Sequence, residues 1–381
     1  MTSTIEQKSR KPEDTAFKQQ RLRAWQPILT PRTVLPTLFI IGIIFAPLGG
    51  IFLYSSSKLF ELAIDYTTCS EYNGTEFSVP ESPNNIILSY GKTTMNADSP
   101  FYFQDSSSCK ISFTLQEEIQ GPIFVYYQLS NFYQNHRRYV KSVSYSQLSG
   151  EAVTASDLYS DCNPIISNTT TNKIVYPCGL IANSIFNDTI FGLKADGADI
   201  PLNEKGITWK SDSKKYNKTS YKVSQIAPPP NWIRRYPDGY NDDNVPNLAE
   251  DEHFQVWMRT AALPNFRKLY ARIDQNLKAA TYTIEIADFF NATDFEGSKL
   301  LVFSTISFLG GKNPYLGLAY LCLGSICVVL GLAFTARHLM YPRKLGDSSY
   351  LSWNQNRLPP STSNRASLHP TSSADPTLAE N

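Results

Sequence analysis

One uncharged stretch near the start of the chain constrains its structure more than any other feature. No charged residue occurs from Thr33 to Ser57, and most of the stretch is apolar (VLPTLFIIGIIFAPLGGIFLY from Val34). As a helix it reaches roughly 37 Å at about 1.5 Å per residue, enough to cross a hydrocarbon core about 30 Å thick. A cleaved signal peptide fits less well, because its apolar region is only about 7 to 15 residues long and lies nearer the N-terminus. The stretch 33–57 is therefore predicted to be a transmembrane helix.

A second uncharged run, NPYLGLAYLCLGSICVVLGLAFTA at 313–336, has the same character. Basic residues precede the first run and follow the second: Lys8, Arg10, Lys11, Lys18, Arg21, Arg23 and Arg32, then Arg337, His338, Arg343 and Lys344. Basic residues favour the cytoplasmic side of a membrane. The predicted order is a cytoplasmic N-terminal tail at 1–32, a transmembrane helix at 33–57, a lumenal or extracellular domain at 58–312, a transmembrane helix at 313–336, and a cytoplasmic, mostly disordered tail at 337–381.

The segment between the two runs alternates short apolar stretches with turn residues. Alternation with a period of two, as in Val125, Tyr127 and Leu129, predicts strands. The predicted strands are 85–90, 110–119, 122–130, 281–290 and 299–308, and helical patterns occur at 132–142, 179–186 and 264–277. The sequence thus predicts a membrane protein with two transmembrane helices and a large β-rich exoplasmic domain, in which antiparallel sheets pack as a sandwich with some helix (α+β).

Four cysteines lie between the spans: Cys69, Cys109, Cys162 and Cys178. An even number in an oxidising compartment predicts two disulfides, for which three connectivities exist. We favour sequential pairing, Cys69 with Cys109 and Cys162 with Cys178, because it closes the shortest loops. A zinc site is disfavoured, since no pair has the close C-x2-C spacing and no histidine lies nearby.

Five N-x-[ST] sequons occur, at Asn73, Asn168, Asn187, Asn217 and Asn291. All five fall in the segment that the predicted topology places outside the cytoplasm. Their placement is consistent with glycosylation.

The segment between the spans offers little for catalysis. It contains two histidines, His136 and His253, and neither a G-x-S-x-G nor an H-E-x-x-H pattern. The tripeptide GKT at 91–93 is not a phosphate-binding loop, because the first glycine of that pattern would fall on Ile86. We therefore expect no enzyme activity, no metal and no cofactor, and a net charge of +1 does not favour a nucleic-acid partner.

Small residues recur on one face of each predicted span. Glycines are seven residues apart at Gly317, Gly324 and Gly331 in the second span and at Gly42 and Gly49 in the first. Such faces let helix backbones approach closely in lipid. Two interpretations remain open: the two spans pack on each other, or one glycine face binds a partner. Under the second, Gly324→Leu should weaken a complex, whereas Val328→Leu, on a neighbouring face, should be tolerated.

A proline-rich excursion at 227–251 contains PPPNWIRRYPDGYNDDNVP, which forbids regular strand pairing. Ordered loops of this length are usually functional. Trp232, Arg234, Arg235 and Tyr236 are of residue types enriched at binding hot spots, so we expect a partner contact there. The alternative is that Trp232 merely holds the loop to its own domain.

Long strings in order along the chain resemble the non-catalytic β subunit of type IV P-type ATPases, the phospholipid flippases, a family that includes the fungal cell division control protein 50 and ligand-effect modulator types. The strings are AFKQQRLRAWQPILTP from Ala16, NFYQNHRRYVKS from Asn131, SQLSG from Ser146, PCGLIANSIFNDT from Pro177, WMRTAALPNFRKLYARI from Trp257 and NPYLGLAYLCLGS from Asn313. The resemblance covers nearly the whole chain, and the four cysteines between the spans match those of the family.

The resemblance implies an accessory subunit that binds a catalytic P-type ATPase as a heterodimer. Its partner needs it for folding, for exit from the endoplasmic reticulum and for activity in the Golgi, endosome or plasma membrane. ATP hydrolysis and the movement of phospholipids, typically aminophospholipids, from the exoplasmic to the cytoplasmic leaflet belong to the catalytic subunit. The chain itself lacks the phosphorylation motif DKTGT.

Two other functions share the predicted topology. One is a two-span subunit of a ligand-gated cation channel, although such channels usually carry more disulfides and pore-lining polar residues than this chain offers. The other is a free-standing adhesion or receptor glycoprotein. A pull-down in mild detergent separates the three.

Overall fold

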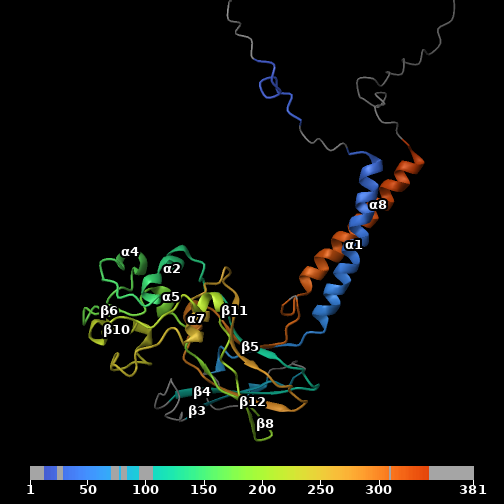
Figure 1. Ribbon diagram of the computed structural model, residues 1–381. Helices are drawn as coiled ribbons and strands as arrows, with labels where there is room; N and C mark the ends of the chain where they lie inside the picture. The colour runs from blue at the N-terminus through green and yellow to red at the C-terminus, as the bar shows by residue number, and fades with distance from the viewer. Residues whose placement is uncertain are drawn as a thin grey trace, which may run out of the picture. The chain divides into compact units, whose positions relative to one another are not determined.

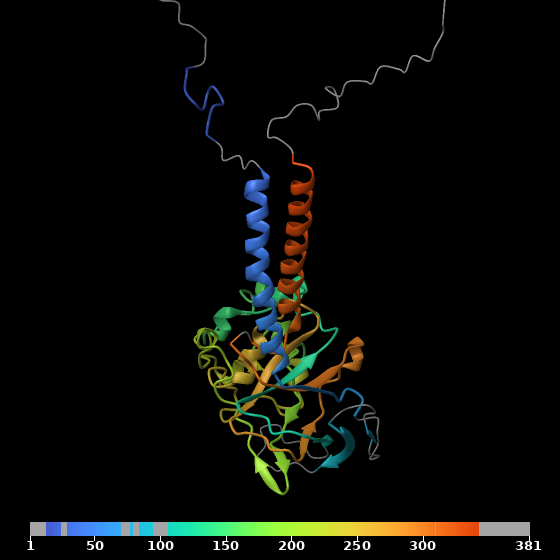
Figure 2. The same cartoon turned by 90° about the vertical axis from the view of Figure 1, so that its right-hand side faces the viewer.

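The computed structural model of the chain describes residues 13–23, 29–69, 77–78, 84–93, 106–308 and 310–342. Within these ranges two helices are long and apolar enough to cross a membrane, α1 (Pro31–Ser57) and α8 (Pro314–Met340), each of 27 residues. They run side by side (Figure 1, Figure 2). Both cover the predicted spans, and α1 begins at a proline, the residue favoured at the first helical position. Helix α8 runs to Met340, into the start of the predicted C-terminal tail; the rest of that tail from 343 onward, and Asn73, lie outside the described residues.

Two antiparallel sheets form the core of the domain between these helices. The first has the order β1-β13-β5-β11, made by Glu61–Asp65, Lys299–Ser304, Ile123–Leu129 and Phe266–Ile273. The second has the order β2-β3-β4-β12-β8-β9, made by Phe77–Ser78, Ile87–Thr93, Ser106–Thr114, Thr281–Ala287, Leu193–Ala195 and Ala198–Ile200, with β7 (Thr189–Ile190) also on β12.

Short elements fill the connections. A parallel pair joins β6 (Ile174–Val175) to β10 (Ile226–Ala227). The helices are α2 (Arg137–Lys141), α3 (Tyr145–Leu148), α4 (Tyr159–Cys162), α5 (Leu180–Asn183), α6 (Lys210–Ser213) and α7 (Glu252–Met258), with 3-10 turns η2 (Val223–Gln225), η3 (Pro230–Trp232) and η4 (Thr293–Phe295). Figure 1 shows that most of the labelled short helices gather to one side of the sheets.

Alternating side chains explain why the sheets pack face to face. Along β5, Ile123, Val125, Tyr127 and Leu129 are buried while their neighbours are partly exposed. Phe113 of β4 and Phe303 of β13 bring their ring centroids within 5.2 Å, which joins the inner faces of the two sheets. The sandwich expected from the sequence is confirmed, and β3, β4, β5, β12 and β13 occur where strands were predicted.

An aromatic cluster extends this core under the short helices. Trp257 of α7 is fully buried, and its Nε1 donates to the carbonyl of Ile181 in α5 at 2.8 Å. The ring of Phe132 lies 5.7 Å from Trp257 and 6.2 Å from Phe290. The strings that begin at Asn131, Pro177 and Trp257 in the sequence therefore meet in one packed region.

The helix predicted at 264–277 is wrong, because strand β11 forms there and pairs with β5. The sequence of β11 does not alternate regularly between apolar and polar residues, because a lysine is buried in it and the register shifts after Leu269. Lys268 is 7% exposed, and its Nζ donates to the carbonyl of Trp257 at 2.8 Å, at the C-terminal end of α7. Burial, and to a smaller extent Arg259, lower the pKa of Lys268 to about 7, and the backbone carbonyls at the end of α7 accept its hydrogen bonds, so a polar residue occupies a core position.

Candidate interaction sites

The glycines of α8 pack against α1. A Cβ on Gly324 would lie 2.6 Å from the backbone nitrogen of Ala46, and one on Gly317 would lie 2.7 Å from that of Leu53. A Cβ on Gly331 would lie 3.1 Å from the ring of Phe39. The face formed by Gly317, Gly324 and Gly331 is therefore filled by the other helix of the same chain.

The glycines of α1 lie on the other side of the same helix contact. A Cβ on Gly49 would lie 2.5 Å from the backbone nitrogen of Leu321, and one on Gly42 would lie 2.5 Å from Val328 Cγ2. Close approach of the two backbones is what small residues permit in lipid. Val328 thus faces Gly42, so the expectation that it lies on a neighbouring, tolerant face is wrong.

Other faces of the helices remain open. Ile43 of α1 and Ile326 and Val329 of α8 are exposed, at 67%, 55% and 63%. In a bilayer these side chains meet lipid or another membrane protein. A partner within the membrane therefore has these surfaces, rather than the glycines, within direct reach.

The proline-rich excursion is held to its own domain by its aromatic residues. Trp232 is 3% exposed, and its Nε1 donates to the carbonyl of Ala182 at 2.9 Å. Tyr236 is also buried, with its ring stacked 6.2 Å from that of Trp232. The alternative interpretation of Trp232 therefore matches its position, and neither ring offers surface to a partner.

The two arginines of the excursion differ. Arg235 is partly buried, forms an ion pair with Asp251 at 3.7 Å, and places its guanidinium 5.4 Å from the ring of Tyr236. Arg234 is exposed, with its guanidinium 5.9 Å from the ring of Phe289, and Ile233 beside it is 63% exposed. Of the four residues singled out from the sequence, Arg234 alone is well exposed to solvent.

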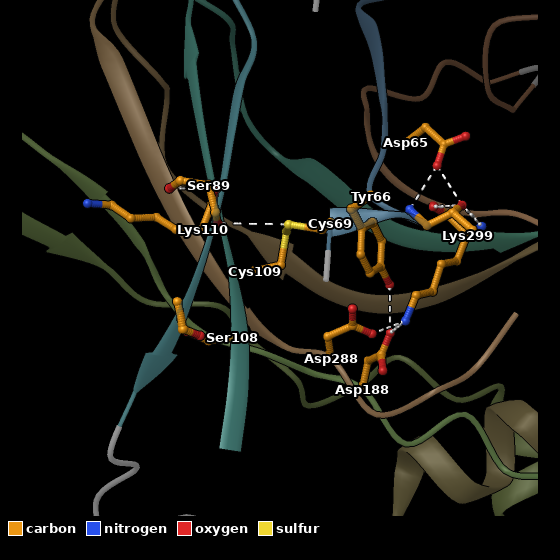
Figure 3. Close-up of a disulfide and its surroundings, with 12 residues drawn as sticks. Asp65, Tyr66, Cys69, Ser89, Ser108, Cys109, Lys110, Asp188, Asp288 and Lys299 are labelled. Atoms are coloured by element: carbon orange, nitrogen blue, oxygen red, sulfur yellow. Dashed lines mark hydrogen bonds and ion pairs between the residues drawn. A yellow bond between two sulfur atoms is a disulfide. The ribbon is translucent and has the colours of Figure 1, made fainter. Parts of the chain in front are cut away.

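Two disulfides stabilise the domain with the sequential pairing expected from the sequence. Cys69 bonds Cys109 across 40 residues, and Cys162 bonds Cys178 across 16. The first links the segment after β1 to strand β4, and so ties the two sheets together (Figure 3). A disulfide that closes a loop of this length restricts the unfolded chain, and so raises the free energy of unfolding by about 3 to 4 kcal/mol.

A buried charge cluster, which the sequence did not reveal, lies near the first disulfide (Figure 3). Lys299 of β13 is 1% exposed, and its Nζ donates to Asp188 at 2.8 Å and also to Asp288. The hydroxyl of Tyr66 donates to Asp188 at 3.0 Å, and the amide of Phe290 donates to the same carboxylate at 2.5 Å. One ammonium group thus joins β13 to the segment before β7 and the segment after β12.

The cluster shifts the pKa values of its members. Burial alone would lower the pKa of Lys299, but Asp188 and Asp288 outweigh it and hold the pKa above its ordinary value. Burial, together with the nearby Asp188, raises the pKa of Asp288. Burial and the same carboxylates raise the pKa of Tyr66 well above its ordinary value. Lys299 therefore stays charged, and its charge makes the buried carboxylates tolerable.

Glu252 organises the loop before α6. Its carboxylate accepts backbone N–H groups of Gly206, Ile207 and Thr208 at 3.0, 2.8 and 3.1 Å. Burial would raise the pKa of Glu252, but these three hydrogen bonds outweigh burial and hold the pKa below its ordinary value. The loop therefore depends on a charged side chain in the first turn of α7.

Glu252→Gln is expected to lower the free energy of unfolding by about 1 to 2 kcal/mol at neutral pH, because a neutral oxygen accepts weaker hydrogen bonds. The folded pKa of Glu252 is depressed, so this stabilisation is present above the ordinary value of 4.5 and is lost as the pH falls through the folded pKa. Unfolding of the full chain, followed from pH 7 to pH 3, should show the difference between wild type and variant shrinking with acid. A difference that stays constant would contradict this role.

The described sequon asparagines differ in exposure. Asn217 and Asn291 are exposed, and Asn168 and Asn187 are partly buried. The two histidines have structural contacts: His136 Nδ1 accepts the amide of Arg138 at 3.3 Å, and His253 lies 3.0 Å from Glu204.

Comparisons with known proteins cover most of the chain. The model of the LEM3 (ligand-effect modulator 3) / CDC50 family matches residues 52–344. The chain is 40% identical to the phospholipid-transporting ATPase accessory subunit CRF1 of Saccharomyces cerevisiae, over 93% of this chain and 91% of that one. It is 41% identical to the accessory subunit CDC50 of Chaetomium thermophilum, over 92% of each chain. It is 44% identical to cell cycle control protein 50A of Mus musculus, over 85% of this chain and 88% of that one.

Proposed function

Because the chain belongs to the LEM3/CDC50 family, we propose that it is the accessory β subunit of a phospholipid-transporting P-type ATPase. The observation that carries the proposal is similarity over about nine-tenths of both chains to relatives named as accessory subunits of such ATPases. Similarity of this extent includes the spans as well as the domain between them. The family expected from the sequence is confirmed.

The catalytic work belongs to the partner in this proposal. The chain lacks the DKTGT motif that is phosphorylated in P-type ATPases. Among the residues that the structure describes, the buried carboxylates Asp188 and Asp288 are occupied by Lys299. We therefore assign ATP hydrolysis and lipid movement from the exoplasmic to the cytoplasmic leaflet to the ATPase, with aminophospholipids as the expected cargo.

Contact with the ATPase is proposed on surfaces that the chain does not use itself. The two spans pack on each other through their glycines, so the opposite faces of α1 and α8 point away from this contact. Ile43, Ile326 and Val329 are on such faces, and Arg234 and Ile233 offer a separate exposed site. Two modest contacts on one chain strengthen each other, because the first raises the effective concentration of the second.

We further propose that both termini are cytoplasmic and that the domain at 58–312 is lumenal and glycosylated. Basic residues outside both spans support this orientation. The described sequons Asn217 and Asn291 are exposed, and the disulfides suit an oxidising compartment. The complex would act in the secretory system, from the endoplasmic reticulum to the Golgi, endosome or plasma membrane, and the chain would assist folding and exit of the ATPase.

Protease added to sealed microsomes tests this topology. Cleavage is expected only in the two tails, so a fragment containing 58–312 and both spans should survive and should shift in mass when glycans are removed. Opening the vesicles with detergent is the control for protease access. Cleavage within 58–312 in sealed vesicles would refute the orientation.

Reconstitution in liposomes tests whether lipid transport requires the ATPase. The isolated chain in liposomes with labelled phosphatidylserine is expected to show only background movement, and the complex with its ATPase should move the lipid when ATP is supplied. ATP-dependent movement by the chain alone would overturn the non-catalytic assignment.

A further inference from the structure

The connection between β13 and α8 carries an exposed apolar tip. Phe308 is 82% exposed, and Ile306, two residues before it, is 45% exposed. The backbones of Ser307 and Gly310 pair on either side of the tip and close a tight turn. We call residues 306–308 and 310 the Phe308 turn. One exposed apolar side chain is common on a soluble surface, so the meaning of this one depends on where the turn lies.

Hydrogen bonds on both sides of the Phe308 turn hold it beside the end of α1. The amide of Thr305 donates to the carbonyl of Phe60 at 3.1 Å, and the amide of Asn313 donates to Ser56 Oγ, in the last turn of α1, at 3.0 Å. The segment 305–313 is four residues longer than the segment 56–60 beside it, so it must bulge out as a loop. Gly310 is three residues from Asn313, so the base of the turn lies within about 11 Å of the start of α8.

These helix ends lie at the boundary of the membrane. Each of the two helices has 27 residues and is therefore about 40 Å long, roughly 10 Å longer than a hydrocarbon core of about 30 Å. Lys58 is the first charged residue after the first uncharged run, and Lys312 is the last before the second. The Phe308 turn therefore projects from the chain at the level of the lipid headgroups.

Residue types that favour a membrane interface surround the turn. Tyr54 in the last turn of α1 is 66% exposed, and Tyr315 in the first turn of α8 is 77% exposed. Lys58 Nζ lies 5.4 Å from the ring of Tyr54, and Lys312 is exposed. Tyrosine rings gather at headgroup level, and lysines lay their apolar stems along apolar surface while the ammonium group stays in water.

The backbone of the turn is prepared to leave water. The amide of Ser307 donates to the carbonyl of Gly310 at 2.8 Å, and the amide of Gly310 donates to the carbonyl of Ser307 at 2.9 Å. Backbone groups that enter a bilayer need partners within the protein, because lipid tails offer none. Inserting the tip therefore leaves none of these four groups unpaired.

We propose that the Phe308 turn inserts the side chains of Phe308 and Ile306 into the adjoining lipid leaflet and attaches the domain at 58–312 to the lipid surface beside the two spans. Apolar side chains gain free energy when they leave water, and interfacial segments bury theirs about 5 to 10 Å into the boundary between headgroups and acyl chains. The inference goes beyond the proposed accessory role, because it gives the chain a contact with lipid outside its spans that requires no ATPase.

An added tryptophan at the tip tests the proposal. The full-length Phe308→Trp variant is placed in phosphatidylcholine vesicles, and the emission of the wild-type chain, with its five tryptophans, is subtracted. The remaining emission is expected at a shorter wavelength than that of tryptophan in water. Phosphatidylcholine brominated near the headgroup end of its acyl chains should quench most of it, and lipid brominated near the chain ends should quench less.

Two further variants serve as controls. Asp196→Trp places the added tryptophan at the exposed turn between β8 and β9, on the other sheet. Its emission should resemble that of tryptophan in water and should not be quenched. Adding Ile306→Asp to Phe308→Trp puts a charge next to the tip, and a charge resists leaving water. This double variant should shift the emission to longer wavelength and lose most of the quenching.

The same measurement on the chain co-purified with its ATPase identifies what covers the tip. Quenching of the tryptophan at position 308 in both the chain alone and the complex is the expected result. Water-like emission without quenching in the chain alone overturns the proposal, and so does equal quenching at positions 196 and 308. Quenching that disappears in the complex assigns the tip to a protein contact and also overturns it. The measurement on the chain alone needs no ATPase, so failure of the accessory role would leave it decisive.

Discussion

Replacing Lys299 by methionine is expected to lower the free energy of unfolding of the chain by about 3 to 5 kcal/mol, the largest loss from a single side chain that we expect in the domain at 58–312. The change leaves Asp188 and Asp288 buried without their cation, and these side chains are 0% and 9% exposed. Burial of an unpaired carboxylate costs far more than the ion pair itself contributes. Chemical unfolding of the purified full-length chain measures the loss.

Lys110→Met is the matched control for this change. Lys110 is an exposed strand lysine of β4, drawn in the same close-up (Figure 3). Its replacement should alter stability by no more than about 0.5 kcal/mol. The variant with Lys299→Met, Asp188→Asn and Asp288→Asn together should recover part of the loss, because no buried charge remains. Equal stability of Lys299→Met and Lys110→Met would show that the cluster does not stabilise the domain.

Replacing Gly49 by leucine is expected to separate the two spans. The added Cβ would lie 2.5 Å from the backbone nitrogen of Leu321 and 2.8 Å from the carbonyl oxygen of Gly317, and backbone atoms cannot turn aside. Overpacking of this kind costs about 1 to 3 kcal/mol or more. The thermal stability and the monodisperse yield of the chain in mild detergent should both fall.

The adjacent glycine supplies the control. A Cβ on Gly50 meets nothing within 4 Å. Gly50→Leu has the same effect on helix propensity as Gly49→Leu but inserts no atom between the helices, so it should behave like wild type. If both variants lose stability equally, the loss comes from the change in composition and not from helix contact.

Features with a regular repeat could be predicted from the sequence. The two uncharged runs predicted both long helices, and alternation of apolar residues predicted β3, β4, β5, β12 and β13. Sequential pairing of the cysteines matched the structure because it closes the shortest loops. Strand β11 was missed because Lys268 occupies a core position and a shift of register breaks the alternation.

The interaction sites were harder to predict, because residue type alone does not give burial. Trp232 and Trp209 are both tryptophans in long irregular segments, yet one is 3% and the other 68% exposed. The glycine spacing identified a close-packed face but could not say which helix covers it. Asp188 lies 111 residues from Lys299 in the sequence, so the charge cluster depends on how the strands pair and has no local sequence pattern.

Affinity purification of the full-length chain from its own membranes in mild detergent tests the accessory role most directly. We expect a phospholipid-transporting P-type ATPase to co-purify in near-equal amount with chain whose glycans have matured. Recovery of the chain alone, or as a homotrimer, with normal glycan maturation and no ATPase, would contradict the role proposed for it.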